Sequence, residues 1–245
     1  MLINRPEKRN ALSQAVLKEL EATFQQHASN PQLLAAVLHG AGERCFAAGG
    51  DLVEFDQVRE PAAVRAMQKH SLAALDAVRT FPVPVIGALN GDAIGGGAEL
   101  AVACDMRVFA HHARIAFVQG QMCISPAWGG GADLMQLVGP ATALRLLSST
   151  DFIAAEAARE LGIAQMIAKT DEDFEAVVER FVKPIRERKP QVMRAFKSLA
   201  LAARQSETWH AVRAAEPELL LETWLHEDHW TASDAVLERI ARQGK

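Results

Sequence analysis

Residues 90–100 read Asn-Gly-Asp-Ala-Ile-Gly-Gly-Gly-Ala-Glu-Leu, and this stretch decides the fold class. The apolar segment 83–89 comes directly before it and has the length of a buried strand. The glycines at 95–97 lead into a short helix, which we predict over 98–103. Further short strands and helices alternate along the chain. This alternation predicts an α/β fold with much parallel strand pairing.

The last quarter of the chain has a different pattern. Nearly everything after residue 172 is predicted to be helical, and Pro184, Pro190 and Pro217 are expected to interrupt the helices. We divide the chain into a core over residues 1–185 and a helical region over residues 186–245. The helical region carries more apolar surface than a lone helical hairpin can bury. It is therefore expected to pack on the core or on another subunit.

Composition narrows the possible functions. The formal net charge of −4 over 245 residues gives no broad electrostatic reason to bind nucleic acid or an anionic membrane. The three cysteines are sparse and lack a CxxC spacing, which argues against a disulfide framework or a structural zinc site. The sequence shows neither a signal peptide at its start nor an apolar run long enough for a transmembrane helix. We expect a cytoplasmic protein with no membrane partner.

Two glycine-rich loops carry the first chemical signal. Residues 46–52 form one loop, residues 90–97 form the other, and each follows an extended apolar segment. Small residues let backbone N–H groups approach a ligand closely, and the second loop opens a helix whose first N–H groups lack partners. Two such donors can stabilise an oxyanion, although two tight turns without a function remain an equal alternative.

Glu99 is the candidate catalytic side chain. It lies in the first turn of the predicted short helix, among small and apolar residues that favour burial. A partly desolvated carboxyl group there can act as a general acid or base. The alternative is a favourable first-turn charge on an exposed helix.

Other candidates are weaker. The run 226–229, His-Glu-Asp-His, could bind a metal, but a solvated turn between two helices is the preferred interpretation. Trp128 is assigned to packing, with a role in lining a pocket left open. The motifs GxSxG, HExxH and GxxxxGK are absent, so serine hydrolase, zinc protease and P-loop functions lack support.

Four blocks of sequence together resemble the crotonase, or enoyl-CoA hydratase/isomerase, superfamily. The stretch 4–12 resembles the opening signature of the superfamily, and 45–52 and 90–105 resemble its two oxyanion loops. The segment 146–163 resembles the part that follows the active site. The resemblance covers nearly the whole chain.

The resemblance implies a crotonase-like spiral of ββα units with a C-terminal helical region for oligomerisation, forming a homotrimer or hexamer. It implies an acyl-CoA substrate and no cofactor beyond the coenzyme A of that substrate, and we predict no metal site. The oxyanion N–H groups fall on Gly50 and Gly96. Ala48 falls where the backbone meets the adenine, and Glu99 on the first of the two hydratase carboxylates.

One departure concerns the second hydratase carboxylate, whose position falls on Gln121. An amide cannot donate or accept a proton at a useful pKa, so simple hydration is in doubt. The stretch 117–130 looks closer to malonyl-type acyl-CoA decarboxylases, with Gln121 and Trp128 as residues of the substrate site. We therefore predict isomerisation or decarboxylation through an enolate. The alternatives are an enoyl-CoA hydratase of fatty acid or aromatic acid degradation, and a non-catalytic protein that binds acyl-CoA or RNA.

Overall fold

Along most of the chain, a strand of one small sheet is followed by a strand of a second small sheet and then by a helix. The computed structural model describes residues 1–243, without the side chains of residues 207, 212 and 243. The first sheet has the strand order β1-β2-β4-β6-β9 and the second has the order β3-β5-β7-β8. The first sheet consists of β1 (Leu2–Ile3), β2 (Ala36–Gly40), β4 (Val85–Leu89), β6 (Met106–Phe109) and β9 (Met166–Ile167). The second consists of β3 (Cys45–Ala47), β5 (Asp92–Ile94), β7 (Arg114–Ala116) and β8 (Ile153–Ala154).

Helices follow each pair of strands. Their bounds are α1 (Gln14–Ala28), α2 (Leu52–Phe55), α3 (Pro61–Arg79), α4 (Gly96–Ala103), α5 (Gly130–Val138), α6 (Pro140–Ser149) and α7 (Ala155–Glu160), with short 3-10 helices η1 (Pro6–Lys8) and η2 (Val118–Met122). A unit of one strand in each sheet followed by a helix occurs repeatedly, as β2-β3-α3, β4-β5-α4 and β6-β7-α5. All pairings are parallel except β7 with β8. The predicted spiral of ββα units is confirmed.

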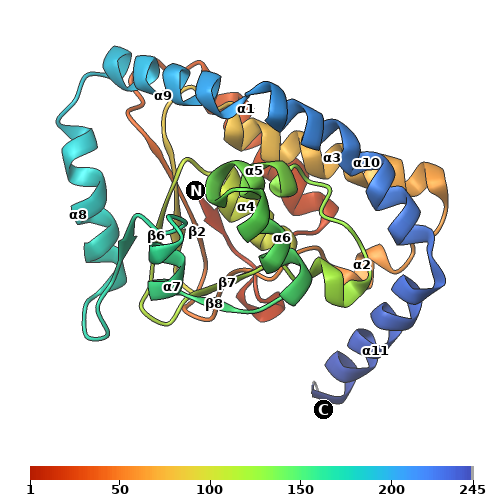
Figure 1. The fold of residues 1–245 in the computed structure, drawn as a ribbon. Coiled ribbons are helices and arrows are strands. Elements are labelled where there is room, and N and C mark those ends of the chain that lie inside the picture. The colour runs from red at the N-terminus through yellow and green to blue at the C-terminus, as the bar shows by residue number, and fades with distance from the viewer. Residues whose placement is uncertain (244–245) are drawn as a thin grey trace.

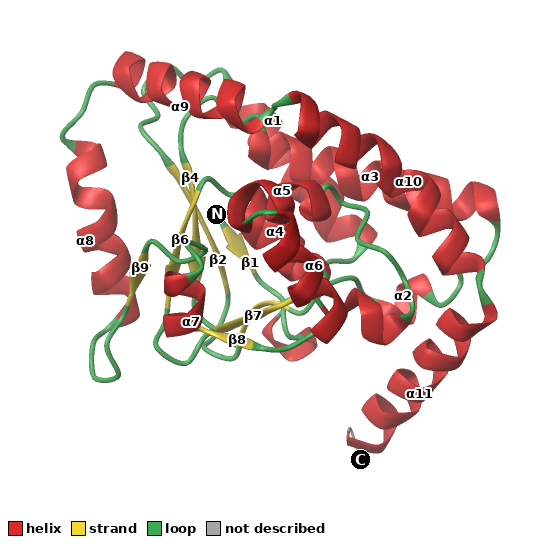
Figure 2. Ribbon diagram, in the orientation of Figure 1, coloured by secondary structure: helices red, strands yellow, loops and turns green. Residues whose placement is uncertain are grey.

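The central strand β4 is buried on both faces. Val85 and Leu89 join the main core, whereas Ile86 and Ala88 face a smaller core against the helix α8 (Phe174–Arg186). Successive side chains of a strand point to opposite faces, so one strand serves both cores. Figure 2 shows α8 on one side of the strands and α3, α4, α5 and α10 on the other.

Strand β2 lies further along the chain than its sequence suggests. The apolar run over residues 33–38 predicts a strand that Gly40 ends, whereas β2 begins at Ala36 and has Gly40 as its last residue, paired with Ile3 of β1. A Cβ at Gly40 would lie 2.5 Å from the carbonyl oxygen of Phe46. This glycine therefore ends the strand and also permits close approach of two chain segments.

The C-terminal helices are α9 (Pro190–Arg204), α10 (Glu207–Leu225) and α11 (Glu227–Gln243). In Figure 1, α9 and α10 run along one side of the molecule, and α11 turns away at the lower right. Helix α10 packs on α3 and α5, and α11 packs on η2 and α2.

The expected proline interruptions were wrong in two cases. Pro184 lies inside α8 and Pro217 inside α10, whereas Pro190 occupies the start of α9. A proline in a helix removes one backbone hydrogen bond, but tertiary packing of an apolar face can hold the helix together. No described helix is both long enough and apolar enough to cross a bilayer.

Candidate active site

The two glycine-rich loops meet at the start of α4. A Cβ at Gly97 would lie 2.0 Å from the carbonyl oxygen of Ala47, so α4 packs directly on the end of β3. A Cβ at Gly49 would lie 3.2 Å from the backbone nitrogen of Gly96. Gly49 also has a φ of +91°, which favours glycine. The absence of a side chain at Gly49 therefore lets the first loop approach Gly96 closely.

All six residues that the sequence predicted for the site line one cavity of about 480 Å³. They are Ala48, Gly50, Gly96, Glu99, Gln121 and Trp128. The side chain of Phe55 covers Gly50, and the indole of Trp128 covers Gly96, because a Cβ would lie 2.5 Å and 2.3 Å from the respective ring carbons. The two aromatic rings therefore form walls next to the two backbone positions.

Glu99 is buried at the cavity wall and takes part in three hydrogen bonds. Its Oε2 accepts from the N–H of Trp128 at 2.9 Å and from the N–H of Gly130 at 3.0 Å. Its Oε1 accepts from Nε2 of Gln119 at 2.9 Å. Burial raises the pKa of Glu99 above its ordinary value, although these hydrogen bonds and the charge of Arg79 oppose the shift. Glu99 is the only acidic side chain among the described residues that line this cavity.

Gln119, rather than Gln121, contacts Glu99. Gln121 lines the cavity, but its amide donates to the hydroxyl of Thr150 at 2.8 Å and the residue is exposed. Gln119 is 6% exposed, and its Oε1 is buried without a hydrogen-bond partner among the described residues. Gln119 is not among the site residues predicted from the sequence. The sequence signal for Gln119 was its position close after Phe117. The helical phase of η2, however, decides whether Gln119 or Gln121 points into the cavity.

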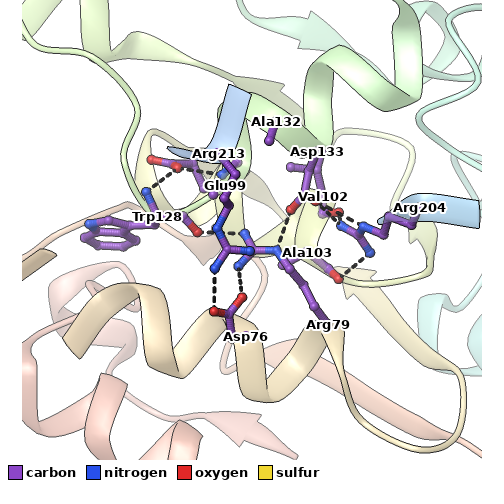
Figure 3. Close-up of polar contacts among 12 residues, drawn as sticks. Asp76, Arg79, Glu99, Val102, Ala103, Trp128, Ala132, Asp133, Arg204 and Arg213 are labelled. Carbon is purple, nitrogen blue, oxygen red and sulfur yellow. Dashed lines mark hydrogen bonds and ion pairs between the residues drawn. The ribbon is translucent and has the colours of Figure 1, made fainter. Parts of the chain in front are cut away.

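A charged network lies behind the site and fixes Trp128 (Figure 3). The guanidinium of Arg79 is 1% exposed and donates to the carbonyl oxygen of Trp128 at 2.6 Å. It also pairs with Asp133 at 2.7 Å and with Asp76 at 3.0 Å. Glu99 therefore holds the N–H of Trp128 while Arg79 holds its carbonyl. Both sides of the residue are fixed by buried ionic groups.

The same network supports the far end of α4. Arg204 of α9 pairs with Asp133 at 2.7 Å and donates to the carbonyl oxygens of Val102 and Ala103 at 2.5 Å and 3.0 Å. A cation at these carbonyls is favourable because they form the negative end of the helix dipole. Arg204 of α9 therefore holds the C-terminal end of the helix that begins at Gly96.

Helix α11 supplies the outer wall of the cavity. His229 lines it and is 2% exposed, so the predicted solvated turn at residues 226–229 is wrong for this residue, whereas residues 226–228 are exposed at the junction between α10 and α11. Nδ1 of His229 lies 2.7 Å from the carbonyl oxygen of Met122, so Nδ1 carries the proton. The ring packs between Trp224 and Trp230, with centroids 4.6 Å and 4.7 Å away. Burial lowers the pKa of His229.

The cavity mouth is basic on the side of β3 and β5. Arg9 and Arg239 line the main cavity, and Arg9 also lines an adjoining cavity of about 310 Å³ with Arg44 and Arg114. Arg114 is already paired with Asp92 at 2.6 Å. No group of three or more metal-binding side chains is found among the described residues.

Comparison with known proteins agrees with this geometry. The sequence model of the enoyl-CoA hydratase/isomerase family matches residues 1–243. The chain belongs to the enoyl-CoA hydratase/isomerase family.

Relatives of similar sequence are named for different reactions. The chain is 31% identical, over 91% of its length and 74% of the relative, to the ethylmalonyl-CoA decarboxylase of Xenopus tropicalis. It is 28% identical, over 96% of its length and 91% of the relative, to a probable enoyl-CoA hydratase of Bacillus subtilis. The crystal structure of an enoyl-CoA hydratase from Bacillus anthracis has a TM-score of 0.79 at 29% identity, over 97% of this chain and 91% of that one.

Proposed function

We propose that this enoyl-CoA hydratase/isomerase family member decarboxylates a malonyl-type acyl-CoA thioester through an enolate. The observation that carries the proposal is the pairing of Glu99 with the amide of Gln119 in a cavity whose described lining residues include no second acid. Addition of water to an enoyl thioester normally divides its proton transfers between two carboxylates. Decarboxylation needs no base. The name of the Xenopus relative supports the same reaction.

The proposed oxyanion hole consists of the N–H groups of Gly50 and Gly96. Both residues line the cavity, and Gly96 is the first residue of α4, whose N–H has no partner within the helix. In the reaction, the bond between Cα and the substrate carboxylate breaks and its electron pair moves into the thioester. The oxygen of the thioester becomes negative, and two fixed donors stabilise it. CO2 leaves.

Glu99 is the proposed proton donor. Burial raises its pKa and so increases the share of protonated carboxyl group, which can transfer its proton to Cα of the enolate and close the reaction. The reaction consumes one proton, which solvent returns to Glu99. Double-bond isomerisation would use Glu99 twice, first as base and then as acid, and it is the second candidate because the same single carboxyl group suffices.

The coenzyme A part of the substrate is proposed to lie along Ala48 and the basic mouth. Arg9 and Arg44 carry charges that suit phosphate groups, and the carbonyl oxygen of Arg9 accepts from the N–H of Ala48 at 3.1 Å. The proposal needs no further cofactor, and the cytoplasm is the proposed location.

Mass spectrometry of a small acyl-CoA panel tests the proposed function. Methylmalonyl-CoA and ethylmalonyl-CoA should lose CO2, and the product formed in D2O should carry one deuterium at Cα. Uptake of water by crotonyl-CoA, without any decarboxylation, would establish a hydratase and overturn the proposal. Migration of the double bond in a 3-enoyl-CoA as the sole activity would favour the isomerase.

A homotrimer or hexamer is proposed from the surface of α9. Val192, Phe196 and Leu199 are 36%, 57% and 70% exposed and recur at helical spacing on one face. The opposite face is anchored to the core, since Lys197 pairs with Asp105 at 2.5 Å. Light scattering should give a trimer or a multiple of it, and the double substitution Phe196→Glu with Leu199→Glu should dissociate it. A wild-type monomer would contradict this assignment.

A further inference from the structure

A second buried carboxylate reaches the site from α10. Glu216 is 4% exposed, and its Oε2 accepts from the N–H of Gly129 at 2.8 Å. Its Oε1 accepts from the N–H of Ala132 at 2.9 Å. Gly131 lies between these contacts, and a Cβ there would lie 2.7 Å from Oε1. The glycines of this turn therefore make room for a side chain that comes from far along the sequence.

Glu99 and Glu216 bind alternating N–H groups of the same turn. Glu99 accepts from Trp128 and Gly130, whereas Glu216 accepts from Gly129 and Ala132. These groups lie at the N-terminus of α5, where free N–H donors and the helix dipole favour anions. Carboxylates from α4 and α10 together satisfy four donors of one turn. Displacement of either one leaves two buried N–H groups without an acceptor.

The turn connects Glu216 to both parts of the proposed catalytic machinery. The indole of Trp128 lies directly against Gly96. The main chain that follows it binds Glu99. A shift of residues 129–132 would therefore move the wall of the oxyanion hole and the hydrogen bonds of the acid at once. Arg79 limits the shift from the opposite side, because it holds the carbonyl oxygen of Trp128.

The charges around the pair are unbalanced. Glu216 faces Glu99 on α4 and Arg79 on α3. Arg79 already pairs with Asp133 of α5 and with Asp76 of α3, and Arg213 of α10 also pairs with Asp76. Burial, followed by the charge of Glu99, raises the pKa of Glu216 to about 8. Two interacting carboxyl groups of this kind titrate as a pair and hold a proton near neutral pH.

We propose that Glu216 is a positioning residue that fixes the turn at residues 128–132 and is coupled in its ionisation to Glu99. It acts through the main chain and through its charge, and it does not touch the substrate. The catalytic consequence rests on the proposed function, since it requires Glu99 to exchange a proton with substrate. The coupling between the two carboxyl groups stands independently of any substrate.

The coupling is measured by NMR on protein labelled with ¹³C at the glutamate side-chain carboxyls. The Glu99 signal is assigned from Glu99→Gln and the Glu216 signal from Glu216→Gln, in which an amide replaces the protonated acid at the same size. The coupling free energy is reciprocal, so the two substitutions together should lower the two midpoints by about one pH unit or more in total. The larger shift should fall on Glu216 in Glu99→Gln, because the charge of Glu99 raises the pKa of Glu216. Unchanged midpoints in both variants would overturn the proposal.

Glu218→Gln is the matched control. Glu218 lies two residues further along α10, is exposed, and pairs with Arg65 at 2.6 Å, so its substitution should leave the midpoint of Glu99 unchanged. An equal shift in this control would mean a general charge effect and would also overturn the proposal. If Glu216→Gln does not fold, the titration of Glu216 in Glu99→Gln still decides the question.

Turnover provides a separate readout. With a substrate from the panel, Glu216→Gln should shift the pH profile of kcat to lower pH in parallel with the NMR midpoint. A loss of kcat with no shift of the profile would leave Glu216 as structural support alone and contradict its control of ionisation. Absence of any activity in the wild type would refute the proposed function but would leave the NMR result valid.

Discussion

The amide of Gln119 donates from Nε2 to Oε1 of Glu99 over 2.9 Å, and both side chains are buried. An amide has a donor and an acceptor, and Oε1 of Gln119 has no partner among the described residues. Rotation of the amide would let it donate to an ionised Glu99 and accept from a protonated one. A carboxylate at residue 119 would repel the ionised form. Gln119 therefore suits a site in which one acid gains and loses a proton.

Gln119→Leu should reduce turnover by about tenfold to a hundredfold. The substitution removes a buried donor to a carboxylate, and such a bond is worth about 1.5–3 kcal/mol. It should also raise the pKa of Glu99, because this hydrogen bond stabilises the ionised form. Steady-state kinetics across pH would show both effects. Gln121→Leu is the control, since that side chain contacts Thr150 at the surface. A larger loss in Gln121→Leu would contradict the assignment.

Glu99→Gln should abolish double-bond migration and leave acyl-CoA binding intact. A glutamine can still accept from the turn at residues 128–130, and Gln119 can rotate to accept from its amide. The fold should therefore survive. Release of CO2 from a malonyl-type substrate should persist at a reduced rate, because bond cleavage needs no base. Calorimetry with a non-reactive acyl-CoA measures the binding. Loss of binding together with activity would make Glu99 structural.

The glycine-rich loops were predictable because their chemistry requires the absence of a side chain. A close approach of backbone to backbone leaves glycine in the sequence, as at Gly97. The alternation of strand and helix was likewise visible from apolar runs. These signals were enough to place all six predicted residues around one cavity. The roles given to those residues remain predictions.

Side chains that act from a distance left no comparable signal. η2 places Gln119 inward and Gln121 outward. The number of residues per turn of the 3-10 helix decides which of these side chains points inward, and this short stretch of sequence does not reveal it. Glu216 and Glu218 flank Pro217 and look alike in sequence, yet one is buried at the active site and the other is exposed. Tertiary packing alone distinguishes them. The same holds for His229, which was predicted to be solvated but packs against Trp224.

Gly96→Ala should lower kcat by about a hundredfold or more, with the fold retained. The added Cβ would lie 2.3 Å from Cζ3 of Trp128, so the indole or the start of α4 must move. Displacement of one oxyanion donor typically costs about 10²–10³ in kcat. The control is Gly120→Ala, whose Cβ would lie 3.1 Å from a methyl group of Thr150. Equal kinetics in Gly96→Ala and wild type would exclude the N–H of Gly96 from the oxyanion hole.

Docking of α11 should weaken as the pH falls. The pKa of His229 is lowered by burial, so the folded state disfavours the protonated ring. A depressed pKa contributes stability above the unfolded value of about 6.5 and loses it below that value. The protection factors of α11, which correct for the pH dependence of intrinsic amide exchange, should therefore fall below about pH 6.5, while those of α4 stay high.

The variant His229→Gln should make the protection factors of α11 independent of pH in this range. Its amide can still donate to the carbonyl oxygen of Met122, and it does not titrate. The matched control is His226→Gln, which alters an exposed ring three residues earlier in the chain and should keep the wild-type pH dependence. Because α11 forms the outer wall of the cavity, the same acid transition should raise KM more than it lowers kcat. Wild-type protection factors in α11 that are constant from about pH 5 to about pH 8 would show that His229 does not control this helix.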